Sequence, residues 1–157
     1  MTEPARILVV GTSAAGKSTF ARQLAQARGL PLVPLDPLFW GPNWTPKPKA
    51  EFVRLLTEAT AGDAWVVDGN YGSVRDVLWP RANQVIWLNY SLPRVFWRGL
   101  KRTAARVLTR EELWHGNRES LRRAFFSRES LLVWILTTHA RRTREFEALR
   151  AANTYPL

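Results

Sequence analysis

The stretch that decides the fold is Gly11-Thr12-Ser13-Ala14-Ala15-Gly16-Lys17-Ser18. It fits the pattern G-x-x-x-x-G-K-[ST] without a gap. The preceding residues, Ile7 to Val10, are β-branched or Leu, which is typical of a strand buried on both faces. The following residues, Ser18 to Arg28, carry Phe20, Leu24 and Ala27 at helical spacing, and Gly29 can end such a helix. Because a strand precedes the motif and a helix follows it, a chance glycine-rich turn is the weaker interpretation.

Each residue type in this turn suits the binding of phosphate. Glycines let the backbone curl into a nest of N–H groups, and the positive end of the following helix stabilises anions. Lys17 would bring a cation to the β- and γ-phosphates, the Ser18 hydroxyl would ligate magnesium, and Thr19 can help at the α-phosphate. We therefore predict that a nucleoside triphosphate is bound by Gly11, Thr12, Ser13, Ala14, Ala15, Gly16, Lys17, Ser18 and Thr19.

A second element predicts the acidic partner of this loop. Trp65-Val66-Val67-Asp68 is an apolar strand that ends in a carboxylate, which is the Walker B pattern. Such a carboxylate can hold a magnesium-bound water, so Ser18 and Asp68 are the predicted metal-site residues. The alternative is that Asp68 only begins a turn with Gly69.

Composition excludes several other classes of protein. The chain has 157 residues, which fits one domain spanning 1–157. It has no Cys, which excludes a disulfide scaffold, a Cys-based zinc site and thiol catalysis. No apolar run approaches the roughly 20 residues of a membrane span, and the first residues do not resemble a signal peptide. We therefore expect a cytoplasmic protein with no membrane partner, while the sequence gives no indication of oligomeric state. The guanine-specific Asn-Lys-x-Asp is absent and the chain is short for a motor, which leaves a small kinase-like protein.

The remaining pattern predicts an α/β fold with a parallel sheet, since short apolar runs alternate with helical stretches. The further strands are expected at residues 32–35, 65–67 and 84–88, and no pattern for a fifth strand is evident. Helices are expected at 49–60, 74–79 and from Ser91 to about Leu108. The segment 36–48 contains four prolines and is expected to be an irregular loop.

The last third of the chain is expected to be helical. Thr109 with Glu112 matches a capping box, and Asn117 is another possible cap. One or two helices would then fill 118–149, with the most apolar residues in the core. These residues are Leu131, Val133, Trp134 and Leu136.

Asp36 is the candidate residue for a second substrate. It follows the second predicted strand, at the edge where ligands of open α/β sheets bind. It could orient an acceptor hydroxyl, act near the magnesium ion, or merely form a turn before Pro37. Phe39, Trp40 and Trp44 could form a wall for the acceptor, but packing of the loop is the favoured interpretation.

The basic residues are concentrated in the second half of the chain. The net charge is +10, of which the residues from Arg94 onward contribute +8. Arginines recur every fourth residue, which places them along one helix face. This row consists of Arg94, Arg98, Arg102, Arg106 and Arg110. We predict that residues 94–128 form a basic lid over a triphosphate, with Arg102 and Arg106 acting in catalysis; Arg118, Arg122 and Arg123 are further candidates, and any one of them could instead be solvated.

Three stretches of the sequence resemble a known protein family. Gly11 to Thr19, Leu35 to Trp40 and Trp65 to Tyr71 are similar to the adenylate-kinase-related P-loop proteins often labelled DNA topology modulation proteins. The basic run from Arg98 to Arg102 is similar to the arginine-rich lid of that family. The resemblance implies a three-layer P-loop NTPase fold with the kinase strand order 2-3-1-4, and ATP with Mg²⁺ as cofactors. The sequence after Asp68 lacks the Pro-Arg of adenylate kinases, which argues against AMP as the acceptor.

Two functions follow from these observations. The favoured one is a small nucleotide or small-molecule kinase, with possible ATPase activity, in which Lys17, Asp36, Arg102 and Arg106 are catalytic. Its unidentified acceptor would bind between Asp36, the proline-rich loop and Asn70-Tyr71. The alternative is a nucleotide-dependent regulator that binds nucleic acid through its basic half, although no nucleic-acid-binding motif is recognisable.

Overall fold

The computed structural model describes residues 4–109, 112–117 and 130–156. They form a four-stranded parallel sheet in the order β2-β3-β1-β4, which confirms the predicted α/β class and strand order. The strands are β1 (Arg6–Gly11), β2 (Leu32–Pro34), β3 (Trp65–Asp68) and β4 (Gln84–Leu88). Within the described residues the sheet has no fifth strand, as the sequence predicted.

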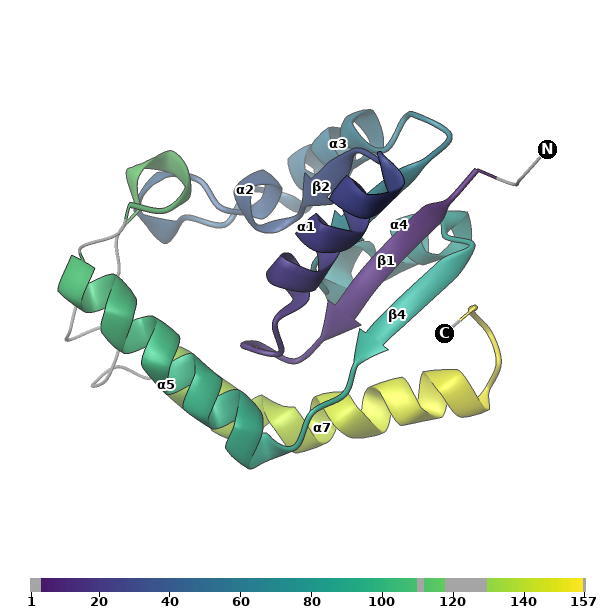
Figure 1. Cartoon of the computed structure of the whole chain (residues 1–157). Helices are drawn as coiled ribbons and strands as arrows, with labels where there is room; N and C mark the ends of the chain where they lie inside the picture. Colours follow the sequence, from purple (N-terminus) through teal and green to yellow (C-terminus); the bar gives the residue numbers. More distant parts are fainter. Residues whose placement is uncertain (1–3, 110–111, 118–129, 157) are drawn as a thin grey trace.

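Helices cover both faces of the sheet, so the molecule has three layers (Figure 1). Ile7 and Val9 of β1 pack on one face against Ala21 and Ala25 of α1 (Lys17–Arg28). The alternate residues of β1 face a larger core built with α3 (Lys49–Ala59), α4 (Arg75–Leu78) and the second half of α7 (Leu131–Ala151). This alternation with period two, in a strand buried on both sides, is why the whole run is apolar.

Short helices and one long helix complete the described chain. They are α2 (Asp36–Phe39), η1 (Pro42–Trp44), η2 (Gly72–Val74), η3 (Trp79–Arg81), α5 (Leu92–Thr109) and η4 (Trp114–Gly116). The expectation of an irregular segment at 36–48 was wrong, since it contains α2 and η1. Pro37 lies in the first turn of α2, where a proline costs no hydrogen bond and its fixed φ suits the helix.

The helix phases differ from those predicted. In α7 the buried apolar residues are Leu132, Ile135 and Phe146, while Trp134 is 45% exposed and Leu136 is 53% exposed. Of the predicted core residues, Leu131 is partly buried and packs against the core beside the phosphate loop. The prediction was wrong for Val133, Trp134 and Leu136, because the face toward α5 and the phosphate loop is offset from them. Similarly, α1 buries two alanines and leaves Phe20 at 36% exposure.

The capping box predicted at Thr109 does not form as expected, whereas the helix that Asn117 was predicted to cap lies outside the described residues. Thr109 is the last residue of α5 rather than the first of a new helix, and its hydroxyl donates to the carbonyl oxygen of Ala105 (2.9 Å). The side chain of Asn117 bonds to another part of the chain, described below. Any helix in 118–129 lies outside the described residues.

The C-terminal tail lies against the outer edge of β4. The Val85 N–H of β4 donates to the carbonyl oxygen of Pro156 (2.7 Å). Tyr155 packs edge-on against Trp79, with 5.0 Å between ring centroids. The tail therefore occupies the side of β4 on which a fifth strand would pair.

No helix in the described ranges 4–109, 112–117 and 130–156 is both long and apolar enough to cross a membrane.

Candidate active site

The loop between β1 and α1 is curled as phosphate binding requires. Gly11, Ala14 and Gly16 have φ of +149°, +61° and +92°, and the Ala15 N–H donates back to the Thr12 carbonyl (3.3 Å). At Gly11 a Cβ would lie 2.7 Å from the carbonyl oxygen of Leu88, so a side chain is excluded there. The nine residues predicted to bind nucleotide thus run from the end of β1 through this turn into the first residues of α1, whose N–H groups have no partner within the helix.

Lys17 lies across this loop. Its Nζ donates to the Thr12 carbonyl oxygen (2.8 Å). Burial lowers the pKa of Lys17 from 10.5 to about 8, opposed by the negative charges of Asp68 and Asp36 and reinforced by the positive charges of Arg102 and Arg142. These five charged residues come from five different elements or their ends, and the structure brings them within electrostatic reach of one another.

Asp68 and Ser18 are adjacent at the end of β3 and the start of α1. Burial raises the pKa of Asp68, while a hydrogen bond with the Ser18 hydroxyl and the charge of Lys17 oppose the shift. The described residues contain no cluster of three or more His, Cys, Asp or Glu able to hold a metal alone. A magnesium ion here would therefore take a hydroxyl and a water-bridged carboxylate from the protein, and its other ligands from phosphate and water, which is its usual preference.

One orphaned polar atom supports a ligand at this loop. The Thr12 hydroxyl oxygen is buried and has no hydrogen-bond partner among the described residues. A buried hydroxyl without a partner is costly unless a ligand or water completes it. The curled backbone, the lysine and the adjacent hydroxyl and carboxylate thus fit a magnesium-bound triphosphate.

Asp36 is held in place by Tyr71, which the sequence analysis placed beside the acceptor without predicting this bond. The Tyr71 hydroxyl donates to Asp36 Oδ1 at 2.5 Å. Burial and the charge of Asp36 raise the pKa of Tyr71, so the phenol stays protonated and remains a donor. The other Asp36 oxygen is not engaged by this bond, which leaves it for a substrate hydroxyl.

An aromatic cluster fixes the segment behind Asp36. Phe39 lies 4.5 Å from Tyr71 and 5.3 Å from Phe52 between ring centroids, and Trp40 packs edge-on against both Phe39 and Trp44. These contacts bind the proline-rich segment to α3 and to the residues after β3. These ring contacts agree with the interpretation that the aromatic side chains pack the loop against the rest of the molecule, rather than with the alternative that they form a wall for the acceptor.

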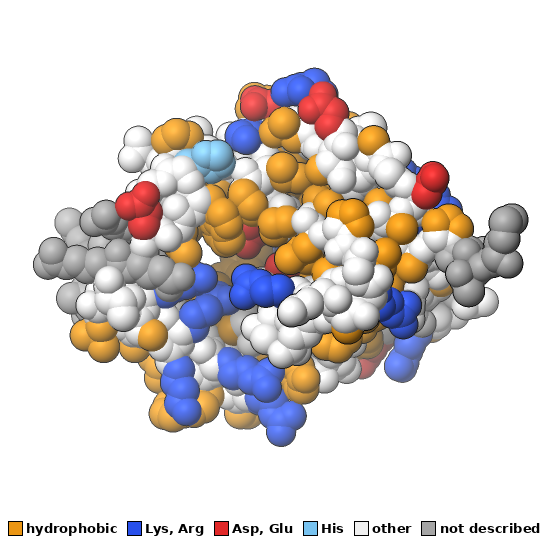
Figure 2. Space-filling model, turned by 45° about the horizontal axis from the view of Figure 1, so that its top comes forward, with side chains coloured by type: hydrophobic (Ala, Val, Ile, Leu, Met, Phe, Trp, Pro, Cys, Tyr) orange, Lys and Arg blue, Asp and Glu red, His pale blue; other side chains and the backbone are white. Residues whose placement is uncertain are grey.

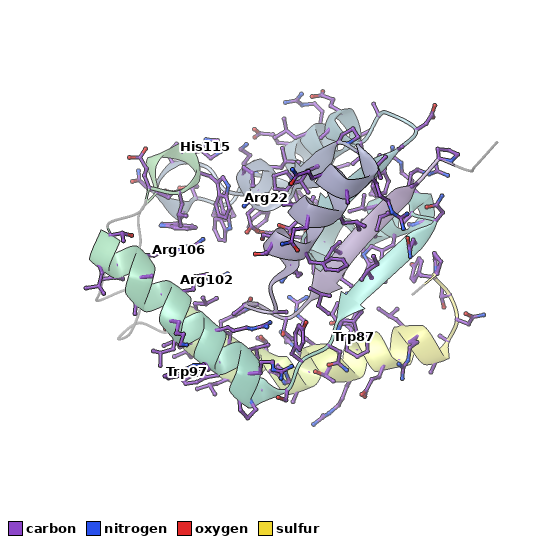
Figure 3. The ribbon with its side chains drawn as sticks, in the orientation of Figure 1. Arg22, Trp87, Trp97, Arg102, Arg106 and His115 are labelled. Atoms are coloured by element: carbon purple, nitrogen blue, oxygen red, sulfur yellow. The ribbon has the colours of Figure 1, made fainter. Side chains whose placement is uncertain are left out.

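The arginine row on α5 is directed toward the phosphate loop. Arg98 donates to the Ala15 carbonyl (3.3 Å), and its guanidinium lies 4.7 Å from the centroid of Tyr90. Figure 3 shows Arg102 and Arg106 on the side of α5 that faces the loop and Trp97 on the opposite side. Of the predicted lid 94–128, only the parts in α5 and 112–117 are described; Arg110, Arg118, Arg122 and Arg123 lie outside.

Sequence reasoning missed the arginines of α7. Arg142 is half-buried and continues the inward stripe of Leu132, Ile135 and Phe146, where an apolar residue would be expected. Burial lowers its pKa, and among the described residues it makes no hydrogen bond or ion pair. The sequence feature that could have revealed Arg142 is its helical spacing from Ile135 and Phe146, which places a cation on the face of α7 that is directed toward the core.

Arg142 borders a surface cavity. The cavity has a volume of about 390 Å³ and is lined by Gly72, Arg141, Arg142 and Glu145. Glu145 is paired with Arg75 at 2.6 Å, so its charge is already matched. The two other arginines leave the lining with an excess of positive charge next to the residue that follows Tyr71.

Figure 2 shows one face of the molecule as a space-filling view. It is hollowed near its centre, with basic side chains along one rim, hydrophobic side chains along the opposite rim and acidic side chains at the floor. A phosphate chain and a second small molecule could therefore meet in one hollow, with carboxylates beneath them.

This arrangement of sheet, loop and helices is the fold of the small P-loop kinases. A solved gluconokinase from Sinorhizobium meliloti 1021 is similar over 97% of this chain and 99% of its own, with a TM-score of 0.50 and 21% identity. A solved shikimate kinase from Bacteroides thetaiotaomicron is similar over 89% of this chain and 80% of its own, with a TM-score of 0.53 and 17% identity. No model of a known protein family and no curated protein matches the sequence.

Proposed function

We propose that this protein is a kinase that transfers the γ-phosphate of ATP, bound with Mg²⁺, to a hydroxyl group of an anionic small molecule. The observation that carries the proposal is the convergence of Asp68, beside Ser18, and Asp36, beside Tyr71, on the Lys17 amine at one edge of the sheet. One carboxylate suits a metal-bound phosphate chain and the other suits an acceptor. That both similar solved structures are kinases supports phosphate transfer.

The nucleotide would be held chiefly by backbone and by Lys17. Residues 11–16 present N–H groups to the phosphates, and Lys17 would exchange its bond to the Thr12 carbonyl for phosphate oxygens. Ser18 and Asp68 would hold magnesium, which would neutralise part of the charge of the phosphate chain. Arg102 and Arg106 would face the equatorial oxygens of the transferred group, where guanidinium groups match the developing charge.

Asp36 would act on the acceptor. Its free oxygen accepts the hydroxyl proton while the acceptor oxygen bonds to the γ-phosphorus and the bond to ADP breaks. The Tyr71 hydroxyl holds the carboxylate in one orientation, because it donates to the other oxygen. Positioning of this kind supplies most of the rate enhancement in phosphoryl transfer.

The arginine-lined cavity indicates the class of acceptor. Arg142 makes no hydrogen bond or ion pair within the described residues, is partly desolvated, and acts electrostatically on Lys17. Such a group is stabilised by a carboxylate or phosphate, which guanidinium binds in a bidentate manner. We expect an acceptor that carries one of these anions together with the reacting hydroxyl.

The test is a screen of hydroxy acids and phosphorylated small molecules with Mg-ATP, read by mass spectrometry for a product 80 Da heavier. We expect at least one such compound to be phosphorylated, and the Lys17→Ala variant to lose transfer while its thermal melting stays cooperative. Arg142→Gln should raise KM for that acceptor and leave KM for ATP unchanged. If no compound in the panel raises ATP consumption above the rate without acceptor, the kinase proposal fails.

Binding of nucleic acid through the basic half is the alternative. The described arginines of α5 weigh against it, because Arg94 and Arg98 lie over the Tyr90 ring and Arg102 acts on Lys17. Fluorescence anisotropy with a labelled duplex across a salt series separates the two functions. Nucleic-acid binding would show a log–log slope near −0.9 per phosphate contact, whereas binding that is absent at about 0.15 M salt rejects it.

A further inference from the structure

A short turn after α5 is bonded to the segment that carries Asp36. Residues 112–117, here called the clasp, form a closed turn in which the Leu113 N–H donates to the Asn117 carbonyl (2.7 Å) and the Asn117 N–H donates to the Trp114 carbonyl (3.2 Å). Residues 36–47, here called the acceptor loop, contain α2 and η1. The clasp and the acceptor loop lie side by side, although about 70 residues separate them in sequence (Figure 1).

Asn117 is the residue that joins the two segments. Its side chain is buried, with 4% exposure. Its Oδ1 accepts from the Trp44 N–H (3.0 Å) and its Nδ2 donates to the Gly41 carbonyl (3.0 Å). A third bond joins His115 Nε2 and the Pro37 carbonyl (3.1 Å). The amide supplies the acceptor and the donor on two separate atoms of one short side chain, so neither Asp nor Leu would replace Asn117.

The part of the acceptor loop that Asn117 holds has an unfavourable backbone conformation. Asn43 and Trp44 have φ of +55° and +57°, a left-handed conformation that is rare for a tryptophan. Such conformations persist where surrounding contacts over-determine them, and they are frequent at functional sites. Asn117 supplies two of those contacts, one at Gly41 ahead of the strained pair and one at the N–H of Trp44 within it.

The loop also has bonds of its own that do not involve the clasp. The Gly41 N–H donates to the Thr45 carbonyl (2.7 Å), and the Lys47 N–H donates to the Phe39 carbonyl (2.8 Å). Leu38 and Phe39 of the loop pack against the larger core, and Asn117 belongs to neither core of the sheet. Removal of the Asn117 side chain should therefore release the attachment of the loop without unfolding the molecule.

We propose that Asn117 is a positioning residue that fixes the acceptor loop, and with it Asp36, relative to the arginine-bearing helix α5. The clasp follows α5 in the chain, and α5 contacts the phosphate loop through Arg98 and acts on Lys17 through Arg102. Occupancy of the nucleotide site is thereby coupled to the order of the acceptor loop. The inference rests on the proposed function only where it assigns Asn117 an effect on catalysis. The coupling between the nucleotide site and the acceptor loop requires only that nucleotide binds.

The coupling is tested by hydrogen–deuterium exchange on the whole protein with and without Mg²⁺ and a non-hydrolysable ATP analogue. In the wild type the peptide covering 40–47 should exchange more slowly when the nucleotide is bound. In Asn117→Ala the same peptide should exchange about tenfold faster than in the wild type, and the nucleotide should no longer slow it. The affinity for the analogue should change less than twofold, because the variant does not touch the phosphate loop.

Two further variants keep the test decisive. Asn117→Asp retains the acceptor for Trp44 N–H but turns an oxygen toward the Gly41 carbonyl, so it should behave like Asn117→Ala. Gln26→Ala removes an exposed amide on α1 and should behave like the wild type. The inference is overturned if the nucleotide still protects the loop in both Asn117 variants, or if exchange rises uniformly across the chain, which would indicate a purely structural role. Failure to find any phosphorylated product would reject the proposed function and leave these exchange results unaffected.

Discussion

Raising the pH from 7 to 9 should weaken the binding of Mg-ATP, because Lys17 loses its proton in this range. Burial places the pKa of Lys17 near 8. A bound triphosphate stabilises the charged amine and raises that pKa, so the free protein must take up a proton in order to bind above pH 8. The protonated fraction falls from about 0.9 at pH 7 to about 0.1 at pH 9, which corresponds to an increase in Kd of about tenfold.

Isothermal titration calorimetry at pH 7, 8 and 9 in two buffers of different ionisation enthalpy measures both the affinity and the proton uptake. Lys17→Arg is the matched control, because a guanidinium stays charged throughout this range and its Kd should vary little. The reasoning is refuted if the wild-type Kd is flat across the range, or if Lys17→Arg shows the same slope. The same shift has a consequence for stability: the pKa in the folded state is lower than the 10.5 of a free lysine, so the cost of burying the charged amine is fully present below about pH 8. That cost is relieved as the pH rises from 8 toward 10.5.

Three other changes have defined outcomes. Gly11→Ala should lower the free energy of unfolding by about 2 to 4 kcal/mol, since its φ is +149° and its Cβ would lie 2.7 Å from the Leu88 carbonyl oxygen; urea denaturation measures this, and an unchanged midpoint would contradict it. Tyr71→Phe keeps the ring packing but removes the bond to Asp36, so kcat with an identified acceptor should fall about tenfold while the Kd for Mg-ATP stays constant; a change confined to the Kd would show that the bond serves nucleotide binding instead. Asp68→Asn should weaken nucleotide binding in Mg²⁺ but not in EDTA, as read by titration with a fluorescent ATP analogue, and equal losses in both conditions would argue against a metal-site role.

The parts of the fold that follow from local pattern could be predicted from the sequence. The motif at residues 11–18 predicts a strand before it and a helix after it, because its glycines and lysine bind phosphate only in a curled loop between these two elements. Strand order 2-3-1-4 then followed from the family resemblance, and the structure has that order. Asp36 and Asp68 could be placed at one edge of the sheet, because the carboxyl ends of parallel strands lie together.

Contacts between distant segments could not be predicted. The sequence indicated Asn117 only as a possible helix cap, and no local pattern shows its bonds to Gly41 and Trp44, which lie far away in the chain. In α7, apolar residues occur on more than one face, so periodicity alone could not show that Ile135 faces the phosphate loop while Trp134 faces away. Arg142 lies on the same inward face of α7 as Ile135, so its position could not be predicted without knowing which face is buried.

The tail beside β4 bears on how this small sheet avoids pairing with other chains. Exposed strand edges are templates for strand addition and aggregation. On one side, β2 is a strand of three residues that ends in Pro34, which has no N–H to donate. On the other side, the Pro156 carbonyl occupies the Val85 N–H. Loss of the contacts that Tyr155 and Pro156 make would open this part of the β4 edge and favour association of two molecules through it.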